Sequence, residues 1–175
     1  MKRAFPVVLL LAALTISGFQ TAGDGYIRSP RLGITFINSG NQPNADERYR
    51  NGLLLGAGWT RYPFYWNSLE TSPGGWNWGA YDPQVINDIT YGLRIDAILL
   101  GIPGFRSDGG VPQGLYAPVF ADGTDNPGAG KAINSANPFA MYAAQVVNRY
   151  KPGGTLASQM GWGTRVGISL WEVWN

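Results

Sequence analysis

The chain has 175 residues, enough for one modest domain, and it contains no cysteine and no histidine. Disulfide bonds, thiol nucleophiles, Ser-His-Asp triads and histidine metal sites are therefore excluded, and any chemistry has to come from carboxylates, Tyr, Lys or Arg. The formal net charge is +2, but Lys2 and Arg3 supply the whole surplus, so no basic stripe remains and nucleic-acid binding is not expected.

The first 23 residues have the layout of a secretory signal peptide. A short basic start precedes an uncharged apolar run over residues 4–19, and small residues follow it. The run is shorter than the ~20 apolar residues that a membrane-spanning helix needs, and Pro6 interrupts it. We therefore expect residues 1–23 to be removed and residues 24–175 to be secreted, extracellular or periplasmic, with no membrane attachment.

Strand and helix patterns alternate along the rest of the chain. Four short apolar runs predict strands, and the last two are almost continuously apolar, as in parallel strands covered on both faces. Between them lie three helical patterns with start or stop signals of their own. In chain order we expect strand 31–37, helix 45–55, strand 56–64, a helix from Asp82 to Gly92, strand 93–103, a helix capped by Asn137 and stopped at Pro152, and strand 165–174.

This alternating order predicts an α/β fold with a parallel sheet built from right-handed crossovers. The loops 63–81 and 104–136 are long, whereas Gly56 and Gly92 make short returns from helix to strand. Long loops at one end of the sheet are the asymmetry of a (β/α)8 barrel, whose active face lies at the carboxyl ends of the strands. A doubly wound sheet also fits the order, but no Gly-rich phosphate turn follows the first strand.

A complete barrel has eight such units and ~250 residues. This chain contains three units and the start of a fourth. We therefore expect a partial (β/α)8 TIM barrel, about strands 1–4 with three helices, truncated at the end of the fourth strand. The expected domains are a signal peptide over residues 1–23 and the N-terminal half of a barrel domain over residues 24–175.

Aromatic residues make up 13% of the chain, a content typical of lightly charged exported domains that handle carbohydrate. Aromatic rings offer flat apolar faces to sugar rings, although most of these side chains are expected in the core. The long loop after the third strand is expected to shape a substrate cleft. Its turn from Asp122 to Asp125 has too few ligands for a calcium loop, so no metal is expected. The cleft residues are Tyr116, Phe120, Asp122 and Asp125.

The last five residues, Trp-Glu-Val-Trp-Asn, resemble the end of strand four in clan A of the glycoside hydrolases, where an Asn precedes a catalytic Glu. Residues 56–85 are similar to the clan's second strand and the loop after it, and "ILLGIP" is similar to its third strand, which closes on Pro. The resemblance covers roughly residues 31–175. The positions that match the second-strand segment are Arg61, Trp66, Glu70, Trp76, Trp78, Tyr81 and Asp82.

The resemblance implies a barrel glycoside hydrolase that cleaves O-glycosidic bonds in poly- or oligosaccharides by a retaining mechanism, without a cofactor. Such a mechanism needs one carboxyl group to protonate the leaving oxygen and a second, ~5–5.5 Å away, to attack. The resemblance implies that the acid/base Glu follows directly after Asn175 and that the nucleophile comes from strand seven. The chain itself then lacks both catalytic residues and is expected to be inactive.

Three residues are candidate substrate-binding residues. Asn175 matches the Asn that binds the sugar 2-hydroxyl, and a cap on the next turn is the alternative. Arg61 matches an Arg that ends strand two and supports the nucleophile, and a surface Arg stacked on a tyrosine is the alternative. Trp66 is either a sugar-stacking platform or part of the loop core.

Four further residues are expected to be structural. If Asn175 faces the barrel mouth, strand alternation places Glu172 with the helix layer, where we expect a buried or half-buried carboxylate paired with an Arg or a backbone group. Trp76 and Trp78 are expected to plug the loop after the second strand. Glu70 is expected to pin that loop through backbone hydrogen bonds.

Two other classes of protein fit the composition. A non-catalytic extracellular carbohydrate-binding protein would use the same aromatic side chains without a catalytic acid. An all-β surface module is favoured by the Gly, Pro and Trp content, and it requires almost no helix.

Overall fold

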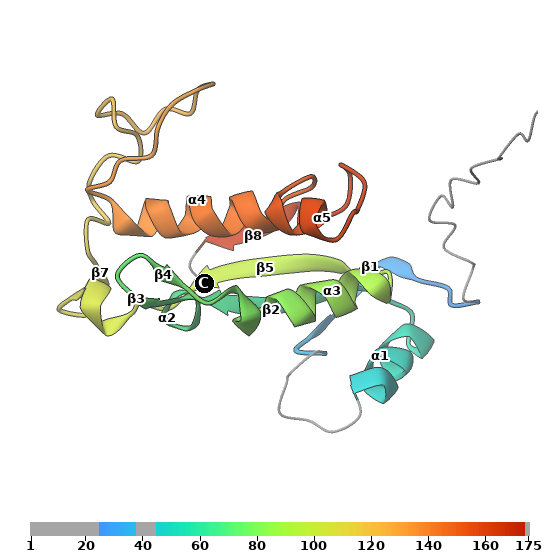
Figure 1. The fold of residues 1–175 in the computed structure, drawn as a ribbon. Coiled ribbons are helices and arrows are strands. Elements are labelled where there is room, and N and C mark those ends of the chain that lie inside the picture. The colour runs from blue at the N-terminus through green and yellow to red at the C-terminus, as the bar shows by residue number, and fades with distance from the viewer. Residues whose placement is uncertain (1–24, 38–44, 174–175) are drawn as a thin grey trace, which may run out of the picture.

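A four-stranded parallel sheet forms the centre of the molecule (Figure 1). The computed structural model describes residues 25–37 and 45–173. The strands are β1 (Ser29–Thr35), β2 (Ala57–Tyr65), β5 (Arg94–Leu100) and β8 (Leu170–Val173). They lie in chain order, and each adjacent pair is parallel, so the predicted α/β fold with a parallel sheet is confirmed.

Helices connect the consecutive strands, as the alternating pattern predicts. They are α1 (Ala45–Leu54), α3 (Asp82–Thr90), α4 (Pro138–Tyr150) and a short α5 (Thr155–Gln159), which the sequence did not predict. Their presence contradicts the all-β alternative. Among the described residues, none of the helices has the length and apolar character needed to cross a membrane.

Helix ends coincide with the local signals in the sequence. The Oδ1 atom of Asn137 accepts a hydrogen bond from the backbone N–H of Ala140 at 3.0 Å, so Asn137 is the N-cap of α4. Gly56 and Gly92 have φ angles of 87° and 71°, which allow the short returns after α1 and α3. The sequence predicts these helix ends correctly because each of the three residues acts within one turn of its own helix.

The fourth strand is shorter than the predicted strand 165–174 and begins at Leu170. The residues before it pack against the end of α4, where the N–H of Ile168 donates to the carbonyl oxygen of Tyr150 at 2.7 Å. This contact takes the backbone at Ile168 out of the sheet. Strand propensity does not include such a long-range hydrogen bond, which explains the wrong boundary.

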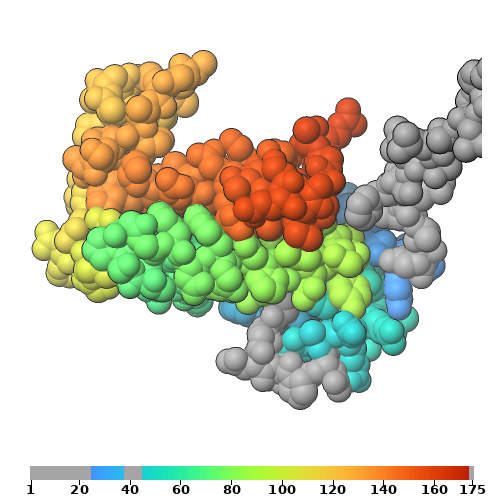
Figure 2. Space-filling model, in the orientation of Figure 1, coloured from blue at the N-terminus to red at the C-terminus, as the bar shows by residue number. Residues whose placement is uncertain are grey.

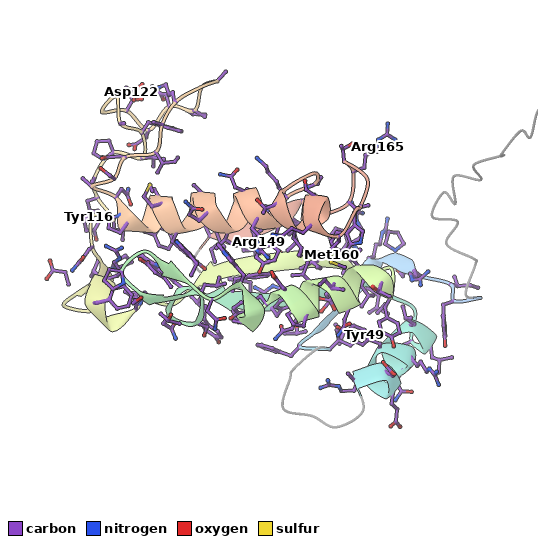
Figure 3. The ribbon with its side chains drawn as sticks, viewed as in Figure 1. Tyr49, Tyr116, Asp122, Arg149, Met160 and Arg165 are labelled. Atoms are coloured by element: carbon purple, nitrogen blue, oxygen red, sulfur yellow. The ribbon has the colours of Figure 1, made fainter. Side chains whose placement is uncertain are left out.

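One face of the sheet carries the hydrophobic core, and we call it the helix-covered face. α3 and α4 pack on it, and α1 lies on the same side because the Tyr49 hydroxyl donates to Asp88 of α3 at 2.7 Å. Asp82 of α3 forms an ion pair with Arg149, which Figure 3 shows between α3 and α4. The core cluster includes Tyr62, Phe64, Val85, Ile95, Ala97, Leu99, Tyr142, Val146, Tyr150 and Ile168.

The opposite face, which we call the open face, carries the alternate residues of the same strands. Cross-strand register places Thr35 of β1, Arg61 of β2 and Asp96 of β5 in one row. Within the described part of the chain, the core clusters show no second helix layer on this face, which a doubly wound sheet would have. The open face includes Trp59, Arg61, Pro63, Tyr65, Arg94, Asp96, Ile98, Leu100, Leu170 and Glu172.

The predicted long loops lie at the carboxyl ends of β2 and β5, on the left of Figure 1. Each contains a small hairpin, and the segment before α4 projects from one corner of the molecule (Figure 2). The loop elements are α2 (Trp66–Leu69), β3 (Glu70–Ser72), β4 (Gly75–Trp76) and the 3-10 turn η1 (Trp78–Ala80) after β2, and the 3-10 turn η2 (Gly104–Arg106), β6 (Ser107–Asp108) and β7 (Val111–Pro112) after β5.

Candidate functional site

An ion cluster on the open face joins three strands. The Nε and Nη2 atoms of Arg61 donate to the two carboxylate oxygens of Glu172 at 2.8 and 2.6 Å. The same Nε lies 3.6 Å from the Oδ2 atom of Asp96. Arg61 therefore makes a bidentate bond to one carboxylate and a weaker contact with a second, and the three charges link β2, β5 and β8.

Two expectations about this cluster were wrong. Arg61 does not end its strand, because β2 continues to Tyr65. Glu172 does not point to the helix layer, because its neighbour Trp171 packs against the core and Glu172 therefore lies on the open face. The prediction took the side of Glu172 from an assumed orientation of Asn175, which lies outside the described residues, whereas the packing of Trp171 shows the side directly. The predicted pairing of Glu172 with an arginine is confirmed.

Asp96 was not singled out from the sequence, although it is the carboxylate of β5, in which Arg94 is the other charged residue. Its side chain is 16% exposed, and burial is the main cause that raises its pKa to about 6. The neighbouring carboxyl group of Glu172 raises the pKa of Asp96 further, and Arg61 opposes the shift. The hydrogen bonds to Glu172 in turn raise the pKa of Arg61 above its ordinary value.

Trp66 belongs to the loop core and is 0% exposed. Its ring stacks on Tyr142 of α4, with the ring centroids 5.0 Å apart. Its Nε1–H donates to the Oε2 atom of Glu70 at 2.6 Å. A sugar-stacking platform needs an exposed ring face, so substrate binding by Trp66 is corrected to the alternative, a loop-core residue that anchors the segment after β2.

Glu70 pins this loop, as the sequence predicts. Besides Trp66, its carboxylate accepts hydrogen bonds from the N–H of Gly74 at 2.9 Å and from Nη2 of Arg106 at 2.7 Å. Burial raises the pKa of Glu70, but these hydrogen bonds and the charge of Arg106 outweigh burial and lower the pKa below its ordinary value. One carboxylate thus joins the loops after β2 and β5.

The predicted plug in the same loop is confirmed. The rings of Trp76 and Trp78 stack with centroids 5.1 Å apart and an angle of 5° between their planes. Both are partly buried against the core, and the guanidinium of Arg149 stands 5.0 Å above the Trp78 ring. These tryptophans hold the loop on the helix layer.

Exposed aromatic side chains lie near the carboxyl edge of the sheet. Tyr65 ends β2, Phe105 lies in the turn after β5, and Tyr116, 90% exposed, points outward in Figure 3. A mostly apolar hollow of about 420 Å³ lies beside Tyr116, between the β6–β7 hairpin, Phe139 of α4 and Val173 of β8. Sequence reasoning included Tyr116 in the cleft and missed Tyr65 and Phe105, whose exposure depends on tertiary packing.

The projecting loop before α4 is ordered by its own polar contacts. The carboxylate of Asp122, labelled in the projecting loop in Figure 3, pairs with Nζ of Lys131 at 2.7 Å. Asp125 accepts a hydrogen bond from the N–H of Val119 at 2.8 Å. Among the described residues, no group of three or more His, Cys, Asp or Glu side chains is arranged to hold a metal ion.

Some sequence predictions concern residues outside the described ranges. Asn175, the candidate ligand of the sugar 2-hydroxyl, lies outside them, and so does the predicted signal peptide over residues 1–23. Their predicted roles stay predictions.

The chain was compared with known proteins. No protein-family model and no curated protein matches it. The features of the chain that bear on its function are the one-sided sheet, the ion cluster on its open face and the aromatic loops at its carboxyl edge.

Proposed function

We propose that this chain is the N-terminal half of the barrel domain of an exported glycoside hydrolase that cleaves O-glycosidic bonds in poly- or oligosaccharides. The observation that carries the proposal is the one-sided sheet, in which four parallel strands follow chain order and α1, α3 and α4 share one face. In a (β/α)8 barrel the helices form an outer ring and the other sheet face turns inward. The elaborate loops after β2 and β5 lie where such barrels have their active face.

The proposed reaction is a retaining cleavage by two carboxyl groups. By the resemblance, the acid/base Glu follows Asn175 and the nucleophile comes from a later strand. Asp96 and Glu172 do not have these roles in the proposal, because both lie at Arg61 in the sheet interior and Arg61 engages both oxygens of Glu172. A nucleophile instead has to stand at the mouth, against the anomeric carbon.

The positions of the side chains in the structure revise the list of proposed substrate contacts. Arg61 supports the floor of the site by holding two carboxylates, and Trp66 supports the loop above it. The exposed rings of Tyr65 and Tyr116 are the proposed sugar-stacking surfaces, because each has an accessible ring close to the carboxyl edge. Asn175 keeps its proposed role at the sugar 2-hydroxyl. The partner is a carbohydrate substrate, and the reaction needs no cofactor.

Two experiments test the enzyme proposal. The coding sequence should continue after Asn175 with a Glu codon and then a Pro codon, whereas a Gln codon or a stop codon would contradict catalysis. A protein extended to a full barrel should hydrolyse aryl glycosides, and replacing that next Glu by Gln should reduce kcat by about 10²–10⁴-fold. The 175-residue chain alone should be inactive, so heat-sensitive hydrolysis by it would overturn the proposal.

The second candidate function is non-catalytic carbohydrate binding, which the exposure of Tyr116 and the apolar hollow beside it favour. Affinity electrophoresis of the chain through gels that contain soluble polysaccharides tests it. Binding by the chain that is lost in Tyr116→Ala, and kept in the control Leu54→Ala on α1, supports this function. If the polysaccharide slows Tyr116→Ala and Leu54→Ala equally in the gel, carbohydrate binding at Tyr116 is contradicted.

A further inference from the structure

Asp96 has few hydrogen bonds and little counter-charge for an ionisable group in the middle of a sheet. Its Oδ1 atom is buried and accepts no hydrogen bond from any donor among the described residues. Its Oδ2 atom has Arg61 at 3.6 Å, which is longer than a hydrogen bond. A carboxylate with so little hydrogen bonding strongly favours its neutral form when it is taken out of water.

The cation beside Asp96 is already engaged. Arg61 uses both its Nε and its Nη2 atoms on Glu172, at 2.8 and 2.6 Å. One positive charge therefore faces two carboxyl groups that lie on the same face of neighbouring strands. Two carboxyl groups that share a site cannot both ionise without a large electrostatic cost.

The charged groups around Asp96 come from each strand beside it. Arg61 projects from β2 and Glu172 from β8, and Arg94 precedes Asp96 on the same face of β5. The guanidinium of Arg94 stands 4.3 Å over the ring of Trp59. Within the described ranges, Arg61 is the cation that lies within 4 Å of Asp96. Among the three groups in contact, Arg61, Asp96 and Glu172, the charge balances when one carboxyl group carries a proton.

We propose that Asp96 and Glu172 share one proton, held on Asp96 in a carboxyl–carboxylate hydrogen bond, and that Arg61 neutralises the remaining negative charge. The proton is taken from solvent and returned to solvent, and no other bond changes. The cluster is neutral with the proton and carries one negative charge without it. This inference goes beyond the proposed function and does not depend on it.

The shared proton makes the sheet sensitive to pH. The pKa of Asp96 is raised to about 6 in the folded chain, mainly by burial and then by Glu172, against about 3.9 when unfolded. Stabilisation by the proton is therefore complete below pH ~4 and is lost as pH rises through ~6. The ratio of folded to unfolded chain should fall by about 100-fold over that range on account of this group.

A carboxyl-carbon NMR titration of the whole chain, labelled at Asp, tests the proposal. Asp96 should titrate near pH 6, and Asp96→Asn assigns the signal. In Glu172→Gln the midpoint should fall towards 4, because the neighbouring negative charge is gone while the side-chain shape is kept. A midpoint near 4 in the wild-type chain, or a midpoint that Glu172→Gln leaves unchanged, would overturn it.

Two further measurements do not depend on the NMR assignment. Asp96→Asn imitates the protonated acid, so it should flatten the change in urea midpoint between pH 4 and 7, while the control Asp108→Asn on β6 should not. The infrared band of a protonated carboxyl group should be present at pH 6, where ordinary carboxyl groups are ionised, should vanish by pH 8 and should be strongly reduced at pH 6 in Asp96→Asn. This band can be read even if the chain associates. An unchanged band in the variant would contradict a proton on Asp96.

Discussion

Arg61 and Trp66 lie only a few residues apart, and both acquire their partners from distant parts of the chain. Arg61 binds Glu172, which is 111 residues away, and Trp66 stacks on Tyr142 of α4. The resemblance assigned both to substrate, and in the structure both hold the scaffold beneath the carboxyl edge. Burial and long-range contacts therefore decide what each of these two side chains does in the structure.

The role of Trp66 predicts a large cost of truncation. Trp66→Ala should lower the free energy of unfolding by about 3–5 kcal/mol, because a fully buried ring leaves a cavity and Glu70 loses a donor. The control Tyr116→Ala should change it by less than about 0.5 kcal/mol, since that ring is exposed. Urea denaturation followed by circular dichroism measures both. Unchanged stability in Trp66→Ala would show that the ring is not part of the core.

One carboxylate, that of Glu70, makes the polar contacts that join the helix turn and the hairpin of the loop after β2. Glu70 bonds the indole of Trp66, the backbone at Gly74 and the side chain of Arg106. Two loops that follow different strands are therefore one unit. This arrangement supports a fixed rather than a mobile wall at the carboxyl edge.

Loss of that carboxylate should loosen both loops together. Glu70→Gln should cost about 1–3 kcal/mol, because the half-buried guanidinium of Arg106 loses its counter-charge. Hydrogen exchange should rise in the loops after β2 and β5, and the exposed control Glu47→Gln on α1 should leave them protected. Because the fold lowers the pKa of Glu70, its stabilisation is present above pH ~4.3 and is lost as pH falls through the folded-state pKa. Equal exchange in Glu70→Gln and the wild type would contradict the anchor.

The start of α4 is held by both the oxygen and the nitrogen of the Asn137 side-chain amide. The Oδ1 atom of Asn137 caps the helix, and its Nδ2 atom donates to the carbonyl oxygen of Ala117 at 2.8 Å. Asn137→Asp keeps the acceptor and loses the donor, whereas Asn137→Ala loses both. Thermal unfolding should rank wild type above Asn137→Asp above Asn137→Ala, with about 1 kcal/mol for the cap. Equal melting temperatures of the two variants would show that the N-cap at residue 137 does not stabilise the chain.

The whole described sheet has two outer edges, β1 and β8, and one face without a helix layer of its own. Unpaired backbone groups at the edge of a sheet attract further strands. Val173 lies at the end of β8 and is 61% exposed, so apolar surface accompanies the free edge. Within the described chain, the sheet is therefore open at both edges.

Association through this edge is therefore expected. Light scattering of the 175-residue chain should show concentration-dependent self-association, and Val173→Lys should reduce it because a charge at an edge opposes strand pairing. The control Leu54→Lys, on an exposed part of α1, should associate like the wild type. A chain that stays monomeric at high concentration would contradict an open edge on β8.

The sequence by itself determined the order of strands and helices, the cap at Asn137, the glycine returns and the uneven loops, because each depends on neighbouring residues or on a short period. Only the tertiary structure decided that α5 forms, that β8 begins at Leu170, that Trp66 is buried and that Asp96 meets Glu172. These features depend on contacts between distant segments. The side of the sheet that Glu172 faces belongs with them, because alternation fixes relative faces along a strand, while packing of Trp171 on the core fixes which face is inward.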